Sequence, residues 1–200
     1  MTNPLFYAKI LLFGEYGIIE DSQGLTLPYS FYKGTLKFSD LNSDFEKKSN
    51  QHLIKYSDYL QNLQLPEGFE LDVDAFKKDI SEGLFFDSNI PQGYGVGSSG
   101  ALVAAIFEKY SVTKRNPETI SKDELKSLRS IFGLMESYFH GKSSGIDPLI
   151  CYMNLPILIE NRESVDKVSI PQSVAGKGAI FLIDSGMTGE TGPMVQIFFE

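Results

Sequence analysis

The chain is 200 residues long, with 42% hydrophobic and 12% aromatic residues, which is enough for a packed core in one domain or in one domain and part of a second. Its formal net charge is −8 and no block of lysine or arginine stands out, which excludes nucleic acid as the main partner, because that partner requires a basic face. No stretch approaches the ~18 apolar residues of a membrane-spanning helix, so we expect no membrane partner.

The N-terminal half of the chain predicts mainly strands. An apolar run that is broken by Lys9 and ended by Gly14 is typical of a strand with one functional cation. The turn pair Lys33–Gly34 lies between or within the strands that follow. In chain order the predicted elements are a strand over 5–13, strands within 25–39, a helix over 43–63 and a strand over 84–90.

The C-terminal half predicts helices and short strands. Ser121 and Glu124 form a capping box, which marks the start of a helix. Because an apolar run is still open at Glu200, we expect the N-terminal portion of a longer protein, with a short C-terminal helix as the alternative. In chain order the predicted elements are a helix over 98–110, a helix from Ser121 to before Gly141, strands over 157–160 and 179–184, and a helix near Gly192.

The cysteine content and the N-terminus bear on the compartment. The single cysteine, Cys151, excludes an internal disulfide framework and fits a reducing environment. As a residue it is either a small buried hydrophobic side chain or a reactive thiol. The first residues lack the cationic segment and apolar core of a signal peptide, so we expect a cytoplasmic protein.

The segment Pro91–Ala101, Pro-Gln-Gly-Tyr-Gly-Val-Gly-Ser-Ser-Gly-Ala, is the most informative stretch. Three glycines at alternate positions let the backbone adopt positive φ and approach a ligand closely. Consecutive N–H groups in such a turn bind anions, and the helix that follows adds its positive N-terminal end. The pattern therefore predicts a phosphate site. Its predicted residues are Pro91, Gly93, Tyr94, Gly95, Val96, Gly97, Ser98 and Ser99.

The glycine spacing separates this segment from two common phosphate-binding loops. No Gly-Lys-Ser/Thr follows, as a P-loop requires, and the last two glycines are closer together than in the Rossmann pattern. Instead, Pro-x-Gly-x-Gly-x-Gly-Ser-Ser-x-Ala after a strand and at the start of a helix resembles the second motif of the GHMP kinase superfamily. That superfamily includes galactokinases, homoserine kinases, mevalonate kinases and phosphomevalonate kinases. A glycine-rich turn capped by serine is the plainer alternative.

Other residues offer the remaining parts of a phosphoryl-transfer site. Lys9 lies in an apolar strand, and its ammonium group needs either an anionic partner or access to water at the strand edge. Glu136 and His140 are four residues apart on one predicted helix and share a face. Asp147 follows in the turn-rich segment 141–148, which could project its carboxylate into a cleft. Taken singly, each of these residues also fits an ordinary surface position.

Together these residues match two further motifs. Residues 8–16 resemble the first GHMP motif of mevalonate kinases, and Glu-x-x-x-His-Gly-x-x-Ser-Gly-x-Asp over residues 136–147 resembles the mevalonate kinase signature. The resemblance implies that Asp147 is the catalytic base and that Lys9 lies beside it and stabilises the transferred charge. It also implies that Ser99 and Glu136 hold Mg²⁺, with ATP as the phosphate donor.

A zinc site is not expected at His140, because the chain has two histidines and one cysteine. We expect His140 to bond the loop around Gly141. For the alcohol substrate, the resemblance assigns Glu15, Tyr16 and Thr191. Relatives usually have histidine in place of Tyr16, and tyrosine can donate a hydrogen bond but cannot become a cation near neutral pH.

Two positions each allow two interpretations. Thr191 is either a substrate contact at a helix start or a plain N-cap. Tyr94 stands where the family usually has a small residue, and it would either stack on adenine or cover the site.

The sequence therefore predicts an α+β fold, resembling the N-terminal domain of a GHMP kinase (ribosomal protein S5 domain 2-like), over residues 1–176. Residues 177–200 would begin a C-terminal domain that is largely missing. The resemblance implies ATP-dependent phosphorylation of the primary hydroxyl of mevalonate and, because mevalonate kinases are often dimers, a homodimer. The rival predictions are another GHMP kinase acting on phosphomevalonate or a sugar, or a catalytically silent sensor of ATP or a metabolite.

Overall fold

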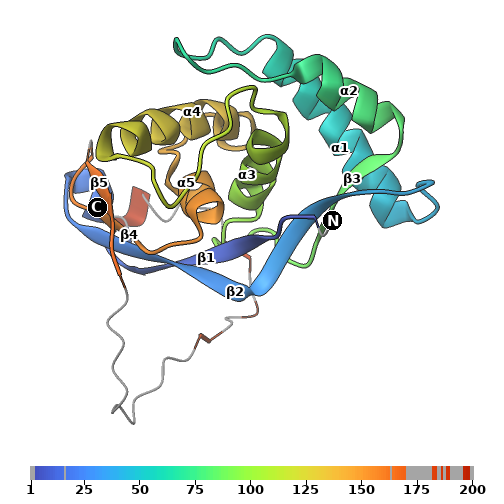
Figure 1. Cartoon of the computed structure of the whole chain (residues 1–200). Helices are drawn as coiled ribbons and strands as arrows, with labels where there is room; N and C mark the ends of the chain where they lie inside the picture. Colours follow the sequence, from blue (N-terminus) through green and yellow to red (C-terminus); the bar gives the residue numbers. More distant parts are fainter. Residues whose placement is uncertain are drawn as a thin grey trace.

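The computed structural model describes residues 3–15, 17–162, 164–169, 182–183, 186, 188–189 and 196–198. Its regular elements combine an antiparallel sheet with helices, as an α+β fold requires (Figure 1). In chain order they are β1 (Phe6–Phe13), the 3-10 helix η1 (Gly17–Glu20), β2 (Gly24–Phe38), α1 (Asp44–Gln61), α2 (Val73–Ser81), β3 (Leu84–Ser88), α3 (Ser98–Tyr110), α4 (Lys122–His140), α5 (Ile146–Met153), β4 (Ile157–Ile159) and β5 (Val165–Lys167).

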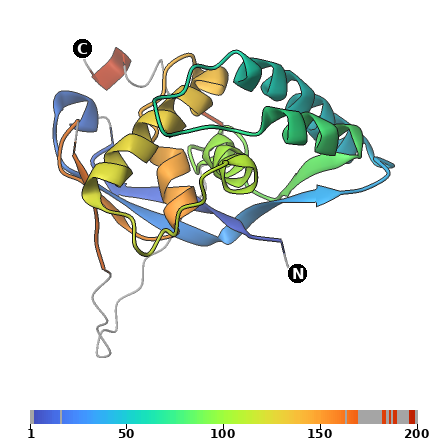
Figure 2. The same ribbon diagram turned by 45° about the horizontal axis from the view of Figure 1, so that its top comes forward.

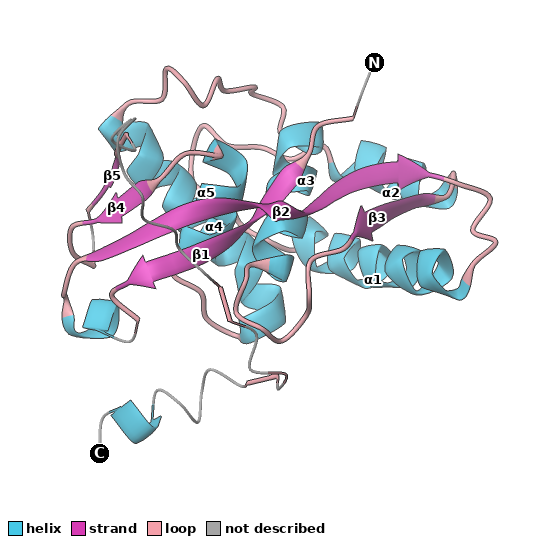
Figure 3. Ribbon diagram, turned by 90° about the horizontal axis from the view of Figure 1, so that it is seen from below, coloured by secondary structure: helices cyan, strands magenta, loops and turns pink. Residues whose placement is uncertain are grey.

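The sheet is organised around the long strand β2. Within the described residues its order is β1-β2-β4-β5, and β3 pairs with the last part of β2 (Figure 3). The pairing with β1 jumps from Tyr7 opposite Lys33 to Ala8 opposite Tyr29, so β2 bulges between these positions. Lys33–Gly34 therefore lies within one strand, which is one of the two placements that the sequence allowed. A Cβ on Gly34 would overlap the Phe86 ring, which explains the glycine.

The helices cover one face of this sheet. In Figures 1 and 2, α3, α4 and α5 lie together over β1 and β2, while α1 and α2 pack near β3. Three aromatic rings, one from each of the three central helices, contact one another: Phe107, Phe132 and Tyr152, with ring centroids 5.0 to 5.5 Å apart. This cluster fixes the relative positions of the three helices whose ends carry Ser99, Glu136 and Asp147.

Most of the predicted elements are present, and the structure also contains elements that were not predicted. The helix over Ser98–Tyr110 has the predicted bounds, and the capping box at Ser121 is formed with Glu124. The helices α2 and α5, the 3-10 helix η1 and strand β5 were not predicted, because each is short and its periodic pattern covers few residues.

Two predictions fall at the end of the chain. The strand over 179–184 and the helix near Gly192 lie outside the described residues, apart from residues 182–183 and 196–198. Among the helices of the described part, none has the length and apolar character needed to cross a membrane.

Candidate active site

The glycine loop connects β3 to α3. Gly93, Gly95 and Gly97 have φ values of 79°, 68° and 83°, all in the left-handed region that favours glycine. Gly97 is the N-cap of α3, and within the described residues no side chain caps this helix end. The first N–H groups of α3 are therefore left without a side-chain cap, which is the arrangement found at helix ends that bind anions.

The loop is held against strand β1 at Lys9. The Lys9 backbone N–H donates to the Val96 carbonyl at 2.9 Å. A Cβ on Gly97 would lie 2.9 Å from Lys9 Cγ and 3.6 Å from the sulfur of Cys151, so this position leaves little room for a side chain. The Cys151 thiol is buried beneath the loop, and burial raises its pKa well above the ordinary value, which supports the buried hydrophobic role rather than a reactive thiol.

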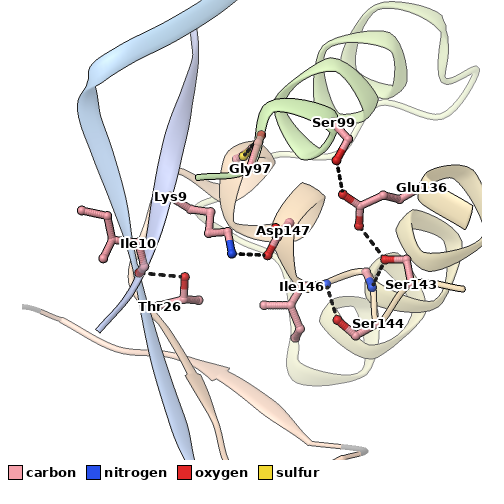
Figure 4. Close-up of polar contacts among 12 residues, drawn as sticks. Lys9, Ile10, Thr26, Gly97, Ser99, Glu136, Ser143, Ser144, Ile146 and Asp147 are labelled. Atoms are coloured by element: carbon pink, nitrogen blue, oxygen red, sulfur yellow. Dashed lines mark hydrogen bonds and ion pairs between the residues drawn. The ribbon is translucent and has the colours of Figure 1, made fainter. Parts of the chain in front are cut away.

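The expected anionic partner of Lys9 is Asp147. Lys9 Nζ lies 2.8 Å from Asp147 Oδ1, with 11% of the lysine side chain and 32% of the aspartate side chain exposed (Figure 4). Burial by itself lowers the pKa of Lys9, but the charge and hydrogen bond of Asp147, with a smaller contribution from the charge of Glu15, raise it on balance. Lys9 is therefore a buried cation near neutral pH and not a lysine that reaches solvent.

Asp147 is carried by a helix and not by the turn that the sequence suggested. It lies in the first turn of α5, which begins after the N-cap Gly145. This turn packs directly on α3, because a Cβ on Gly100 would come within 2.7 Å of the Asp147 carbonyl carbon and 3.0 Å of Asp147 Cβ. The absence of a side chain at Gly100 thus sets the distance between the glycine loop and the Asp147 carboxylate.

Gly100→Ala provides a test of this packing. On helix propensity alone, alanine inside a helix should stabilise the protein by about 1 kcal/mol. We expect instead a loss of about 1–3 kcal/mol, because the new methyl group forces the first turn of α5 away from α3. Given the catalytic role that the family resemblance implies for Asp147, its displacement by about 1 Å should also lower kcat by about 100-fold. Chemical denaturation and steady-state kinetics measure both effects, and a stabilised, fully active variant would contradict this role for Gly100.

Glu136 is a buried carboxylate next to the loop. Only 3% of the residue is exposed, and its two oxygens accept hydrogen bonds from Ser99 Oγ at 2.9 Å and Ser143 Oγ at 2.5 Å. Burial is the main cause that raises the pKa of Glu136 to about 7, and the charge of Asp147 raises it further, while Ser143, Ser99 and Lys9 oppose the shift. Among the described residues, no cation forms an ion pair with Glu136.

The oxygen atoms of Glu136 and Ser99 fit a Mg²⁺ site that is completed by water and phosphate. They do not fit a metal site in which the protein supplies every ligand. In the described part of the chain, no group of three or more His, Cys, Asp or Glu residues could hold a metal ion. Mg²⁺ is commonly held by one or two carboxylates together with water and substrate phosphates. The Glu136 carboxylate on α4 and the hydroxyl of Ser99 at the start of α3 are oxygen groups of this kind, 2.9 Å apart.

His140 has a different partner from the one expected. It shares a face of α4 with Glu136, but its Nε2 lies 3.1 Å from Ser99 Oγ instead of bonding the loop around Gly141. Ser99 therefore contacts both Glu136 and His140. The sequence did not indicate this contact, because α3 and α4 are brought together only by the fold.

The structure describes some of the remaining predicted site residues and not others. Tyr94 is exposed at the loop, while Pro91, Val96 and Ser98 are half-buried. Glu15 is exposed, and its charge acts on Lys9. Tyr16 and Thr191, the other predicted substrate residues, lie outside the described residues.

Two contacts at the site were missed by sequence reasoning. The Gly189 N–H donates to the Gly93 carbonyl at 3.0 Å, and a Cβ on Gly93 would lie 3.2 Å from the Thr188 side chain. Ser143 bonds Glu136, although it occupies an unspecified position of the signature over residues 136–147. The first contact joins segments that are distant in the sequence, and the second involves a position that the signature leaves unspecified, so neither has a sequence signal.

A comparison with known protein families places the chain in one of them. The sequence model of the family described as "GHMP kinases N terminal domain" matches residues 55–154, which include the glycine loop, Glu136 and Asp147. The chain therefore belongs to the GHMP kinase family, and its fold is that of the N-terminal domain.

Individual relatives match over much of the chain but over only part of their own length. A galactokinase from Dictyostelium discoideum is 26% identical, over 98% of this chain and 44% of the relative. The L. major mevalonate kinase in complex with R-mevalonate is 16% identical, with a TM-score of 0.48, over 86% of this chain and 53% of that one. The Methanococcus jannaschii mevalonate kinase is 16% identical, with a TM-score of 0.47, over 84% and 56% respectively. The chain thus spans about half the length of these proteins.

Proposed function

We propose that the protein is an ATP-dependent small-molecule kinase that phosphorylates the primary hydroxyl of mevalonate. The observation that carries the proposal is the Lys9–Asp147 ion pair beside the uncapped start of α3. A base, a buried cation and a phosphate-binding helix end are the parts that phosphoryl transfer requires. The choice of mevalonate rests on the signature over residues 136–147.

In this proposal each group has one task. The N–H groups of the glycine loop and of the α3 start bind the ATP phosphates. Asp147 accepts the proton of the substrate hydroxyl. The oxygen of that hydroxyl forms a bond to the γ-phosphorus of ATP as the bond between the γ-phosphorus and the leaving ADP oxygen breaks. Lys9 orients the Asp147 carboxylate and stabilises the transferred charge. Ser99 and Glu136 would hold Mg²⁺, which when bound neutralises phosphate charge.

A sugar is the second candidate substrate. The galactokinase from Dictyostelium discoideum is a relative at 26% identity, and this favours a sugar over phosphomevalonate as the second choice. A catalytically silent ATP sensor is disfavoured by the buried Lys9–Asp147 pair, because binding alone needs no base.

A coupled ADP-release screen of the full-length protein with mevalonate, phosphomevalonate, galactose and other sugars separates these candidates. We expect turnover with mevalonate. Turnover with a sugar and not with mevalonate would show that the substrate is a sugar. ATP binding without turnover on any alcohol would overturn the kinase proposal in favour of the sensor.

A further inference from the structure

Ser143 links the two acidic residues of the candidate site. Its hydroxyl donates to Glu136 Oε2 at 2.5 Å and accepts a hydrogen bond from the Gly145 N–H at 3.0 Å (Figure 4). Gly145 is the N-cap of α5, and Asp147 follows in its first turn, where it pairs with Lys9. One hydroxyl group therefore connects Glu136 to the start of the helix that carries Asp147.

The backbone around Ser143 is held firmly against α4. A Cβ on Gly145 would overlap the Arg129 carbonyl oxygen and lie 2.6 Å from the Gly133 nitrogen, and a Cβ on Gly133 would lie 3.0 Å from the Ser143 carbonyl oxygen. Arg129 Nε also donates to the Ser144 carbonyl at 3.1 Å. A glycine inside a helix costs about 1 kcal/mol relative to alanine. At position 133 the glycine is required because the Ser143 carbonyl oxygen leaves little room for a side chain.

The two oxygens of Glu136 are held by different parts of the fold. Ser99, from the helix that follows the glycine loop, donates to Oε1, whereas Ser143, from the segment before α5, donates to Oε2. Ser144, the serine that the signature specifies, instead accepts a hydrogen bond from the Ile146 N–H at 3.4 Å. The orientation of the Glu136 carboxylate thus depends on a serine outside the signature.

We propose that Ser143 is a positioning residue, which fixes the Glu136 carboxylate for a divalent cation and keeps it in register with the helix of Asp147. The inference rests on the proposed function, in which Glu136 is a metal ligand. Groups that orient a metal ligand through a hydrogen bond typically change metal affinity by about 10- to 100-fold when they are removed. The loss of the Ser143 hydroxyl should act in the same way, without removing any ligand.

The test is a titration of the full chain with Mn²⁺ in the presence of a non-hydrolysable ATP analogue, followed by the electron paramagnetic resonance signal of free Mn²⁺. We expect Ser143→Ala to weaken Mn²⁺ binding about 10-fold and Ser143→Thr to restore most of it. Ser137→Ala is the matched control, because this half-buried serine of α4 donates to the Gly133 carbonyl, at 2.7 Å, and not to Glu136. It should bind Mn²⁺ like the wild-type chain.

Glu136→Gln separates this inference from the proposed function. If Glu136→Gln leaves Mn²⁺ binding unchanged, Glu136 is not a metal ligand and the proposed function loses its metal site. If Glu136→Gln weakens binding and Ser143→Ala does not, the role of Ser143 is overturned while the proposed function stands.

Amide hydrogen exchange provides a second measurement that needs no metal. The Gly145 amide should exchange faster in Ser143→Ala and not in Ser137→Ala, because its acceptor is the Ser143 hydroxyl. Unchanged exchange at Gly145 in a folded Ser143→Ala variant would contradict the link to α5.

Discussion

Asp147→Asn is expected to lower kcat by about 10²- to 10⁴-fold, the usual contribution of a positioned general base, with little change in ATP affinity. The asparagine side chain has nearly the same shape and can still accept a hydrogen bond from Lys9 Nζ, but it cannot take the proton of the substrate hydroxyl. The nucleotide phosphates contact the glycine loop and not this residue in the proposed mechanism. Steady-state kinetics and a direct ATP-binding measurement therefore report different effects.

The control for Asp147→Asn is Asp166→Asn. Asp166 also pairs with a lysine, at 3.4 Å from Lys122, but 44% of its side chain is exposed and it lies on β5. Exposed ion pairs contribute at most about 1 kcal/mol, so this variant should keep its stability and kcat. If Asp147→Asn retained wild-type kcat, Asp147 would have to be removed from the base role.

A second large effect is expected on the pH dependence of stability. The pKa of Glu136 is raised from 4.5 to about 7, mainly because the carboxyl group is buried. Between these two pH values the folded chain holds a proton that the unfolded chain has released. The free energy of unfolding of the metal-free protein should therefore fall as pH rises through this window, and one group with this shift contributes about 3 kcal/mol.

Chemical denaturation of the wild-type chain and of Glu136→Gln at several pH values measures this contribution. The glutamine keeps one acceptor oxygen for one of the two serines and presents its amide N–H₂ to the hydroxyl oxygen of the other, but it does not ionise, so this part of the pH dependence should disappear. The difference between the two proteins is the informative quantity, because the other ionisable groups contribute to both. Equal pH dependence in the two proteins would show that Glu136 is ionised at ordinary pH in the folded chain.

Sequence reasoning was most successful where the signal is local. The glycine loop, the helix over Ser98–Tyr110 and the capping box at Ser121 each depend on residues close together in the chain, and all three are present in the structure. The need of Lys9 for an anionic partner followed from the cost of burying an unpaired charge, and Asp147 meets that need.

Several contacts between distant segments were not predicted from the sequence. The sequence allowed Lys33–Gly34 to lie within a strand, but it did not indicate that Gly34 is required by the Phe86 ring of a neighbouring strand. The hydroxyl of Ser99 also contacts His140, and this contact depends on how α3 and α4 pack. Such contacts have no fixed spacing in the chain, so no pattern could predict them.

The sequence by itself determined the α+β class, the glycine loop and the residue types of the candidate site, because these follow from local backbone preference and from motif spacing. Only the tertiary structure decided how the site is assembled. It placed Gly100 against α5, so that Asp147 reaches Lys9, and Ser143 against Glu136. These relations depend on close packing between helices, whose contact distances are set by the three-dimensional fit of side chains and backbone.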